Sequence, residues 1–126
     1  MFETLELTRM ARAMASHAGA RLGVVAANVA NADSPGYKAR DMPTFAETYS
    51  GQEDMRMTRP GHLGAASPAM AEPQIVRGPG SPNGNTVNLE TEMVRAVAVR
   101  QDHEMALAIS RNTSEIIRAS LGRRGL

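Results

Sequence analysis

Residues that could carry chemistry are few and widely spaced in this chain of 126 residues. The three histidines, His17, His62 and His103, show no HExxH or similarly dense metal-ligand spacing. Cysteine is absent, which excludes disulfides, thiolate nucleophiles and cysteine-ligated zinc. His17 and His103 could meet across a pair of helices, but packing or solvation explains them better. We therefore expect no metal site, no cofactor and no catalytic nucleophile.

Four carboxylates near the C-terminus could be read as acid–base pairs. Catalytic carboxyls usually need an apolar pocket that raises the pKa of one partner. Aromatic residues make up only 3% of the chain, so little material is present for such a pocket. We interpret the four as a charged, solvated helix face and predict that the protein is not an enzyme and has no small-molecule substrate. They are Glu90, Glu92, Asp102 and Glu104.

The charge balance argues against binding driven by net charge. Fourteen basic residues against thirteen acidic ones leave a formal charge of +1, whereas nucleic-acid phosphates call for an excess of Lys and Arg. No stretch approaches the ~20 apolar residues of a transmembrane helix. At the N-terminus, charged and apolar residues alternate, so no cleaved secretory signal is visible. The protein is therefore expected to stay in the cytoplasm or to use an export route that reads no such signal.

Proline divides the chain into three segments. Six of the seven prolines lie within residues 43–88, where they break helices and central strands. We predict an N-terminal helix over residues 1–34, a turn and irregular middle over residues 35–87, and a C-terminal helix over residues 88–126. The fold is expected to be mostly α, with the two long helices packed as a coiled-coil-like pair. The short Pro/Gly-rich middle leaves room for a small β element, with short strands at 74–77 and near 86–87.

Both helices show an apolar period of eleven residues. In the first, the stripe repeats from Leu7 to Ala18 to Val29; in the second, from Val94 to Met105 to Ile116. Eleven residues in three turns, about 3.67 per turn, favour a straight helix or a slight right-handed supercoil. The residues predicted to pack the helices are Leu7, Met14, Leu22, Val25, Val29, Val94, Met105, Ile109 and Ile116.

This stripe contains few large side chains. Full burial of each gives roughly 1.5–3 kcal/mol, whereas backbone ordering costs on the order of 1–2 kcal/mol per residue before hydrogen bonds contribute. One thin two-helix hairpin is therefore marginal by itself, and we expect neighbouring subunits to cover part of both helices.

A turn signal follows the first helix. Pro35 disfavours helical geometry at Ser34, and the sequence from Ser34 to Tyr37 suits a type II turn with Pro second and Gly36 third. Asn31, just before it, tolerates left-handed geometry and can bond local backbone groups. On physical grounds alone, the segment is a helix terminus followed by a turn. At the other end of the middle segment, Asn88 can serve as the N-cap of the second helix.

The same segment carries a resemblance. An Asn-rich helix end that runs into Pro35, Gly36 and Tyr37 resembles the N-terminal signature of flagellar rod, hook and hook-associated proteins. The continuation over residues 38–41, the downstream residues 84–94 and the short chain are similar to proximal-rod members of the flagellar basal-body rod protein family.

The resemblance implies a structural subunit of the proximal rod, which polymerises through its terminal helices to build a drive shaft and export channel. Implied partners are other copies of the chain, other rod proteins and a membrane-ring or export-gate adaptor at the base; no nucleic acid is implied. The implied location is the periplasmic rod, reached through the flagellar type III apparatus without a cleaved signal. His103 stands where such sequences tend to carry an aromatic residue. The implied assembly motif consists of Asn28, Asn31, Asp33, Pro35, Gly36 and Tyr37.

A cytoplasmic adaptor remains the alternative interpretation. In this case the helical hairpin binds an amphipathic partner helix in solution. An adaptor is expected to be a stable helical monomer or dimer, whereas a rod subunit is expected to be partly helical until it polymerises.

Overall fold

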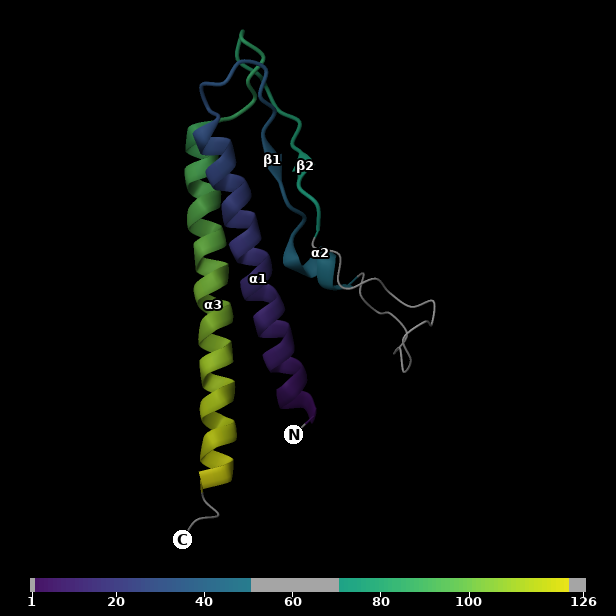
Figure 1. The fold of residues 1–126 in the computed structure, drawn as a ribbon, viewed down its shortest axis with the longest axis vertical. Coiled ribbons are helices and arrows are strands. Elements are labelled where there is room, and N and C mark those ends of the chain that lie inside the picture. Colours follow the sequence, from purple (N-terminus) through teal and green to yellow (C-terminus); the bar gives the residue numbers. More distant parts are fainter. Residues whose placement is uncertain (1, 51–70, 123–126) are drawn as a thin grey trace.

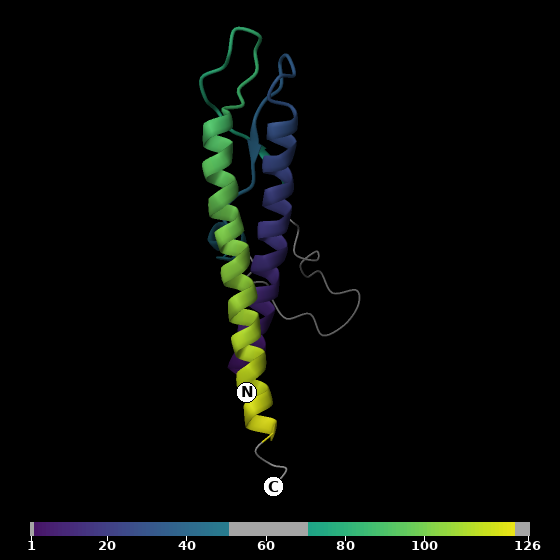
Figure 2. The same ribbon diagram turned by 90° about the vertical axis from the view of Figure 1, so that its left-hand side faces the viewer.

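Two long antiparallel helices form the body of the protein. The computed structural model describes residues 2–50 and 71–122. Helix α1 (Phe2–Ala30) and helix α3 (Leu89–Gly122) lie side by side along an elongated molecule, with both chain ends at the same end (Figures 1 and 2). At 1.5 Å per residue, the helices are about 44 and 51 Å long. The prediction of a mostly α fold with paired terminal helices is confirmed.

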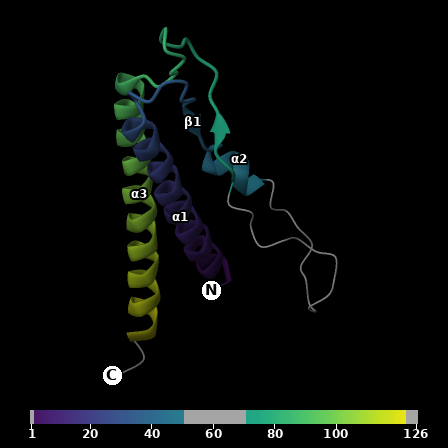
Figure 3. The same cartoon turned by 45° about the horizontal axis from the view of Figure 1, so that its top comes forward.

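A small arm packs beside the helical pair. It contains strand β1 (Arg40–Asp41), helix α2 (Phe45–Ser50) and strand β2 (Gln74–Ile75), with β1 antiparallel to β2 and Arg40 opposite Ile75. Both β1 and α2 contact α1, and the arm stands off to the α1 side of the pair (Figures 1 and 3). A small β element in the middle segment is thus confirmed.

The strands differ in detail from the prediction. The strand expected at 74–77 spans only Gln74–Ile75, and its partner β1 was not predicted. No strand forms at 86–87, so that prediction is wrong. Thr86 instead makes two isolated bonds: its amide donates to the Tyr37 carbonyl at 3.0 Å, and its hydroxyl accepts from the Ala39 amide at 2.9 Å.

Helix α2 begins with a capping box, a local signal that the sequence analysis missed. The Thr44 amide and hydroxyl donate to Glu47 Oε2 at 2.9 and 2.8 Å, and the Glu47 amide returns a bond to Thr44 Oγ1 at 3.4 Å. These bonds, first the amide and then the hydroxyl, lower the pKa of Glu47 below its ordinary value. The pattern Thr-x-x-Glu after Pro43 could have predicted this helix start.

The contact between α1 and α3 repeats every seven residues. Heptad spacing of core positions is the pattern of a left-handed coiled coil. The buried residues at this spacing are Ala11, Ala18 and Val25 on α1, and Glu92, Val99, Ala106 and Thr113 on α3; Asn28 of α1 is also buried. The seam inside the chain therefore follows a seven-residue period, in place of the predicted eleven.

The eleven-residue stripe lies mostly outside this seam. Val25 is buried, whereas Val94, Met105 and Ile116 are 72%, 48% and 63% exposed. Leu7, Leu22 and Val29 are also exposed, and Met14 and Ile109 are half-buried. Alanine at the seam positions lets the two helices approach closely, which leaves the larger side chains on the flanks. Packing of these larger residues between subunits remains a prediction.

Candidate assembly site

The end of α1 forms the turn that the sequence predicts. The Tyr37 amide donates to the Ser34 carbonyl at 3.3 Å, and Gly36 adopts φ +72°, as the third position of a type II turn requires. One turn earlier, Asn31 Nδ2 donates to the Ala27 carbonyl at 2.8 Å, and Asn31 Oδ1 accepts from the Ser34 hydroxyl at 3.2 Å. We call this end of the molecule, where α1, the turn, β1 and the start of α3 meet, the junction.

Asn28 is the centre of the junction. Its side chain is fully buried and makes four hydrogen bonds. Nδ2 donates to the Arg40 carbonyl at 2.6 Å and to Glu92 Oε2 at 3.1 Å. Oδ1 accepts from the Tyr37 hydroxyl at 3.2 Å and from the Arg40 amide at 3.1 Å. One amide therefore connects α1 to the turn, to β1 and to α3.

An ion network extends from Asn28 along the helices. Glu92 pairs with Arg95 one turn later, and Arg95 Nε lies 3.2 Å from Asp41 Oδ2. Arg21 donates to both oxygens of Asp41, each at 2.9 Å. Glu92 is buried, so its interpretation as part of a solvated face is wrong. The carboxylate tolerates burial because Arg95 and the Asn28 amide both donate to it.

The network shifts the pKa values of Asp41 and Arg21. Burial acts to raise the pKa of the Asp41 carboxyl, but the Arg21 hydrogen bonds and charge, the Met42 amide and the charge of Arg95 together lower it below its ordinary value. The hydrogen bond to Asp41 correspondingly raises the pKa of the Arg21 guanidinium, against the effect of burial. The charged forms of Asp41 and Arg21 are thus both favoured by the folded arrangement.

Acid should weaken the attachment of the arm through Asp41. A carboxyl whose pKa is lower in the folded state contributes stability above its unfolded pKa of about 3.9, and that stability is lost as the pH falls through the folded value. We expect Asp41→Asn to lower the thermal midpoint at pH 7. Below about pH 4, the midpoint of this variant should fall less steeply with pH than that of the unchanged protein. Circular dichroism melts between pH 7 and pH 2.5 provide the measurement. Parallel pH curves for the two proteins would contradict the assignment.

Asn85 closes the other side of the junction. It is buried, and its Nδ2 hydrogens are shared among the carbonyls of Asn31, Ala32 and Ser34 at 2.8–2.9 Å. Its Oδ1 accepts from the Val87 amide at 2.8 Å. These three residues follow Ala30, the last residue of α1, so a side chain from far along the sequence holds the turn after the helix in place.

Two glycines touch where the turn meets the residues before α3. Gly84 has φ +82°, and a Cβ there would lie 3.4 Å from the Gly36 Cα atom. The Gly36 amide donates to the Asn83 carbonyl at 3.0 Å, and Lys38 Nζ donates to the Gly84 carbonyl at 3.0 Å. The sequence analysis did not assign roles to Gly84 and Asn85, although the turn-rich composition around them was visible.

The structure brings most of the predicted assembly motif together. Asn28, Asn31, Gly36 and Tyr37 all bond within the junction. Asp33 and Pro35 are exposed on its outside. At the start of α3, Asn88 caps the helix as predicted, because its Oδ1 accepts from the Thr91 amide at 3.2 Å.

His17 and His103 do not meet. His17 Nε2 is 2.8 Å from the Pro43 carbonyl oxygen, and its ring packs against Phe45 at 5.8 Å between centroids. His103 lines a groove between α1 and α3 with Leu22 and Val97, away from the arm. His62 lies outside the described residues. Within residues 2–50 and 71–122, no group of three His, Asp or Glu side chains is placed to hold a metal ion.

Comparison with known proteins gives the family. Residues 11–38 match the family of flagella basal body rod proteins. The flagellar basal body rod protein FlgB of Cereibacter sphaeroides is 34% identical over 107 residues, which cover 81% of this chain and 84% of that protein. FlgB of Agrobacterium fabrum is 29% identical over 113 residues, 82% of this chain and 83% of that protein. The chain belongs to the flagellar basal-body rod protein family.

Membership of the rod protein family places the chain in the flagellar basal body, in a structural role alongside other rod components. The family is structural and not enzymatic. Its matched segment runs from Ala11 through Asn28 and the turn to Lys38, so it includes the α1 half of the junction. None of the helices in the described part of the chain has the length and apolar character needed to cross a membrane.

Proposed function

We propose that this rod protein is a subunit of the proximal rod that polymerises through α1 and α3 to build the drive shaft and its export channel. The observation that carries the proposal is the number of large apolar side chains that the paired helices leave exposed. Extensive exposed apolar surface on a protein commonly marks an interaction site. The exposed residues on α3 include Met93, Val94, Val97, Met105, Ile116 and Leu121.

The division of apolar residues supports this role. The seam within the chain uses small side chains such as Ala11, Ala18 and Ala106, whereas the largest aliphatic side chains of α3 lie outside it. A pair of helices stabilised by so little internal burial gains from contacts with neighbours on its remaining faces. Polymerisation would bury the flanks that the single chain leaves in water.

The junction has a specific task in this proposal. Asn28, Gly36 and Tyr37 fix where α1 ends and how the chain turns into the arm, so they set the angle between the helical pair and the arm. Neighbouring subunits would meet both parts, and a rod needs every copy to present them identically. The remaining motif positions, Asp33 and Pro35, are exposed and available to neighbours.

The other expectations complete the proposal. The subunit reaches the periplasm through the flagellar type III apparatus without a cleaved signal, and contacts other rod proteins and a membrane-ring or export-gate adaptor at the base. It binds no cofactor and no nucleic acid, and it catalyses no reaction. Similarity to the FlgB proteins supports these statements.

Deletion of the gene tests the proposal. We expect a non-motile strain whose isolated basal bodies keep the membrane ring but lack the rod, and complementation with the intact gene should restore both. Electron microscopy of basal bodies and swimming assays give the readouts. Normal rods in the deletion strain would overturn the proposal, and a stable cytoplasmic complex without any rod defect would favour the adaptor.

The substitution Gly36→Val should damage assembly more than secretion. The left-handed conformation at φ +72° costs an L-residue roughly 1–2 kcal/mol, and a β-branched residue more. The matched control is Gly78→Val, because Gly78 has no positive φ and nothing lies within 4 Å of an added Cβ. Counts of complete rods and the amount of exported subunit should separate the two variants. Normal rods in the Gly36→Val strain would count against the role of the turn.

A further inference from the structure

We propose that copies of this chain pack side by side through a basic flank on α3 and an acidic flank on α1 of the next copy. The basic flank is the depression lined by Ser110, Arg111, Ser114, Glu115 and Arg118, with two arginines against one glutamate, and the acidic flank that lined by Glu3, Glu6, Leu7 and Met10. This inference rests on the proposed rod function and names the surfaces through which one copy meets another.

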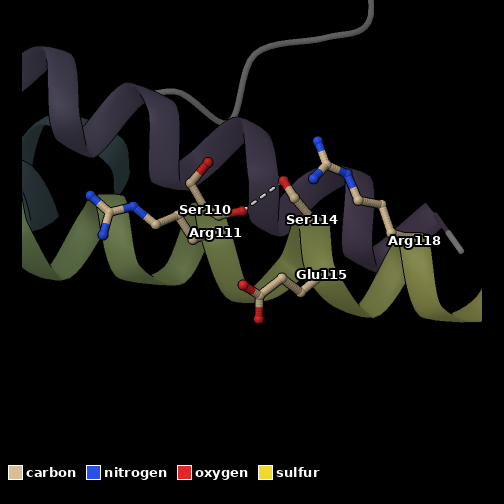
Figure 4. Close-up of a pocket in the computed structure, with 5 residues that line it drawn as sticks. All are labelled: Ser110, Arg111, Ser114, Glu115 and Arg118. Carbon is tan, nitrogen blue, oxygen red and sulfur yellow. Dashed lines mark hydrogen bonds between the residues drawn. The ribbon is translucent and has the colours of Figure 1, made fainter.

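The basic flank is a shallow depression on the outside of α3. Arg111 and Arg118 are seven residues apart and therefore lie on one line along the helix, on either side of Ser114. Figure 4 shows the Arg118 guanidinium close to Ser114 and the Arg111 guanidinium extended away from Ser110, while the carboxylate of Glu115, which also lines the depression, points away from the two serines. Ser114 Oγ donates to the Ser110 carbonyl at 2.8 Å. Neither arginine has an ion-pair partner within residues 2–50 and 71–122.

The acidic flank is a depression near the start of α1. Glu3, Glu6, Leu7 and Met10 line it, and Leu7 is exposed. Glu3 lies two heptads before His17, and Met10 lies one heptad before it. Both therefore face the same side of α1 as His17, which contacts Pro43 beside the arm. No ion pair involves either glutamate among the residues that the structure describes.

The two flanks lie at the same height on opposite sides of the helical pair. Asn28 bonds Glu92 near one end, and the helices are antiparallel, so the level of Glu6 on α1 corresponds to that of Ser114 on α3. Ser110 lies one heptad after His103. The basic flank is therefore on the same side of α3 as the groove that Leu22, Val97 and His103 line. The acidic flank is on the side of His17 and the arm.

The two flanks lie on opposite sides of the molecule and carry opposite charge. Copies can therefore associate side by side, each placing its basic flank against the acidic flank of the next. Two parallel copies at equal height would place Arg111 and Arg118 of one beside Glu3 and Glu6 of the next. Such heterologous contacts propagate from copy to copy around a ring or a helix. Exposed ion pairs contribute little affinity individually, so we assign the register and orientation of the contact to the charges. We assign its affinity to Leu7, Met10 and the apolar side chains of the groove, Leu22 and Val97.

Disulfide cross-linking tests the contact directly. The chain has no cysteine, so Glu6→Cys combined with Arg111→Cys introduces the only thiols. In isolated basal bodies under mild oxidation, we expect a ladder of multiples of the 13.5 kDa chain. The single variants and the pair Glu6→Cys with Gln101→Cys, whose α3 residue is exposed away from both flanks, should give no ladder. Absence of the ladder in assembled rods, or exclusive cross-linking to a different rod protein, would overturn the inference.

Charge reversal provides an independent test that distinguishes contact from folding. We expect Arg111→Glu with Arg118→Glu, and Glu3→Lys with Glu6→Lys, each to reduce the number of complete rods roughly 5–10-fold, because two ion pairs become repulsive. Lysine near the start of α1 also weakens the helix, so the combined four-fold variant is decisive. Restored rods support the contact; a combined variant no better than its parents contradicts it. If deletion abolishes the rod but both tests fail, the docking inference alone falls; if deletion leaves rods intact, the proposed function falls with it.

Discussion

Replacing Asn28 by alanine is expected to destabilise the helical pair by about 3 kcal/mol and to abolish rod formation. The substitution removes four hydrogen bonds and leaves the Arg40 backbone, the Tyr37 hydroxyl and the buried Glu92 carboxylate without that partner. Each buried polar group left unpaired costs about 1–3 kcal/mol, and a charged group costs more. Whole domains are stable by only about 5–15 kcal/mol, so this loss is a large fraction.

Helical content and the thermal midpoint of the purified protein, measured by circular dichroism, give the first readout, and basal-body morphology gives the second. The matched control is Asn31→Ala, three residues later, directly after the end of α1. The Asn31 side chain donates to the local Ala27 carbonyl and accepts from the Ser34 hydroxyl, so its loss should cost less than about 1 kcal/mol. Equal destabilisation by the two variants would show that Asn28 is an ordinary helix-end residue and not the centre of the junction.

Asn85→Ala is expected to have the second largest effect, about 2–3 kcal/mol. The Asn85 amide is shared among three carbonyls in the turn that follows α1 and accepts from the Val87 amide, so one truncation leaves several half-buried backbone groups without that partner. The turn after α1 should loosen and lose its fixed position relative to α3. The expected phenotype is subunit export with few complete rods.

Hydrogen exchange of the amides in the turn after α1 measures this loosening directly. Exchange should accelerate at Ser34 and Tyr37, whose amides donate to carbonyls that Asn85 also binds, and much less in the control Asn83→Ala. Asn83 is exposed, and its side chain makes one bond, to the Asn85 amide at 3.1 Å. Unchanged protection of these amides in the Asn85 variant would be incompatible with its role in holding the turn.

Features that depend on neighbours in sequence could be predicted from the sequence. The turn at Pro35 and Gly36 follows from restricted φ at proline and from the left-handed freedom of glycine. The Asn88 cap and the two long helices follow from residues within a few positions of one another. The capping box at Thr44 was equally local and could have been predicted, and it was overlooked inside a segment dominated by proline and glycine.

The few residues that could carry chemistry could be interpreted correctly only with the tertiary structure. Glu92 looked like one of several solvated carboxylates, because nothing nearby in sequence except Arg95 reveals its burial. Its partner Asn28 is 64 residues away, and Asn85 lies more than 50 residues from the carbonyls it binds. Local patterns cannot show which distant side chain satisfies a buried polar group.

The sequence by itself determined the helices, the turn and the family resemblance, whereas the tertiary structure decided which helix faces meet. Alanine occupies so many positions of α1 that a seven-residue and an eleven-residue stripe coexist in it. Selection between them depends on close approach to α3, which favours Ala11, Ala18 and Ala106 at the seam and leaves Val94, Met105 and Ile116 exposed. Packing energy belongs to a pair of surfaces and not to one helix, so the choice of seam appears only when both helices are placed together.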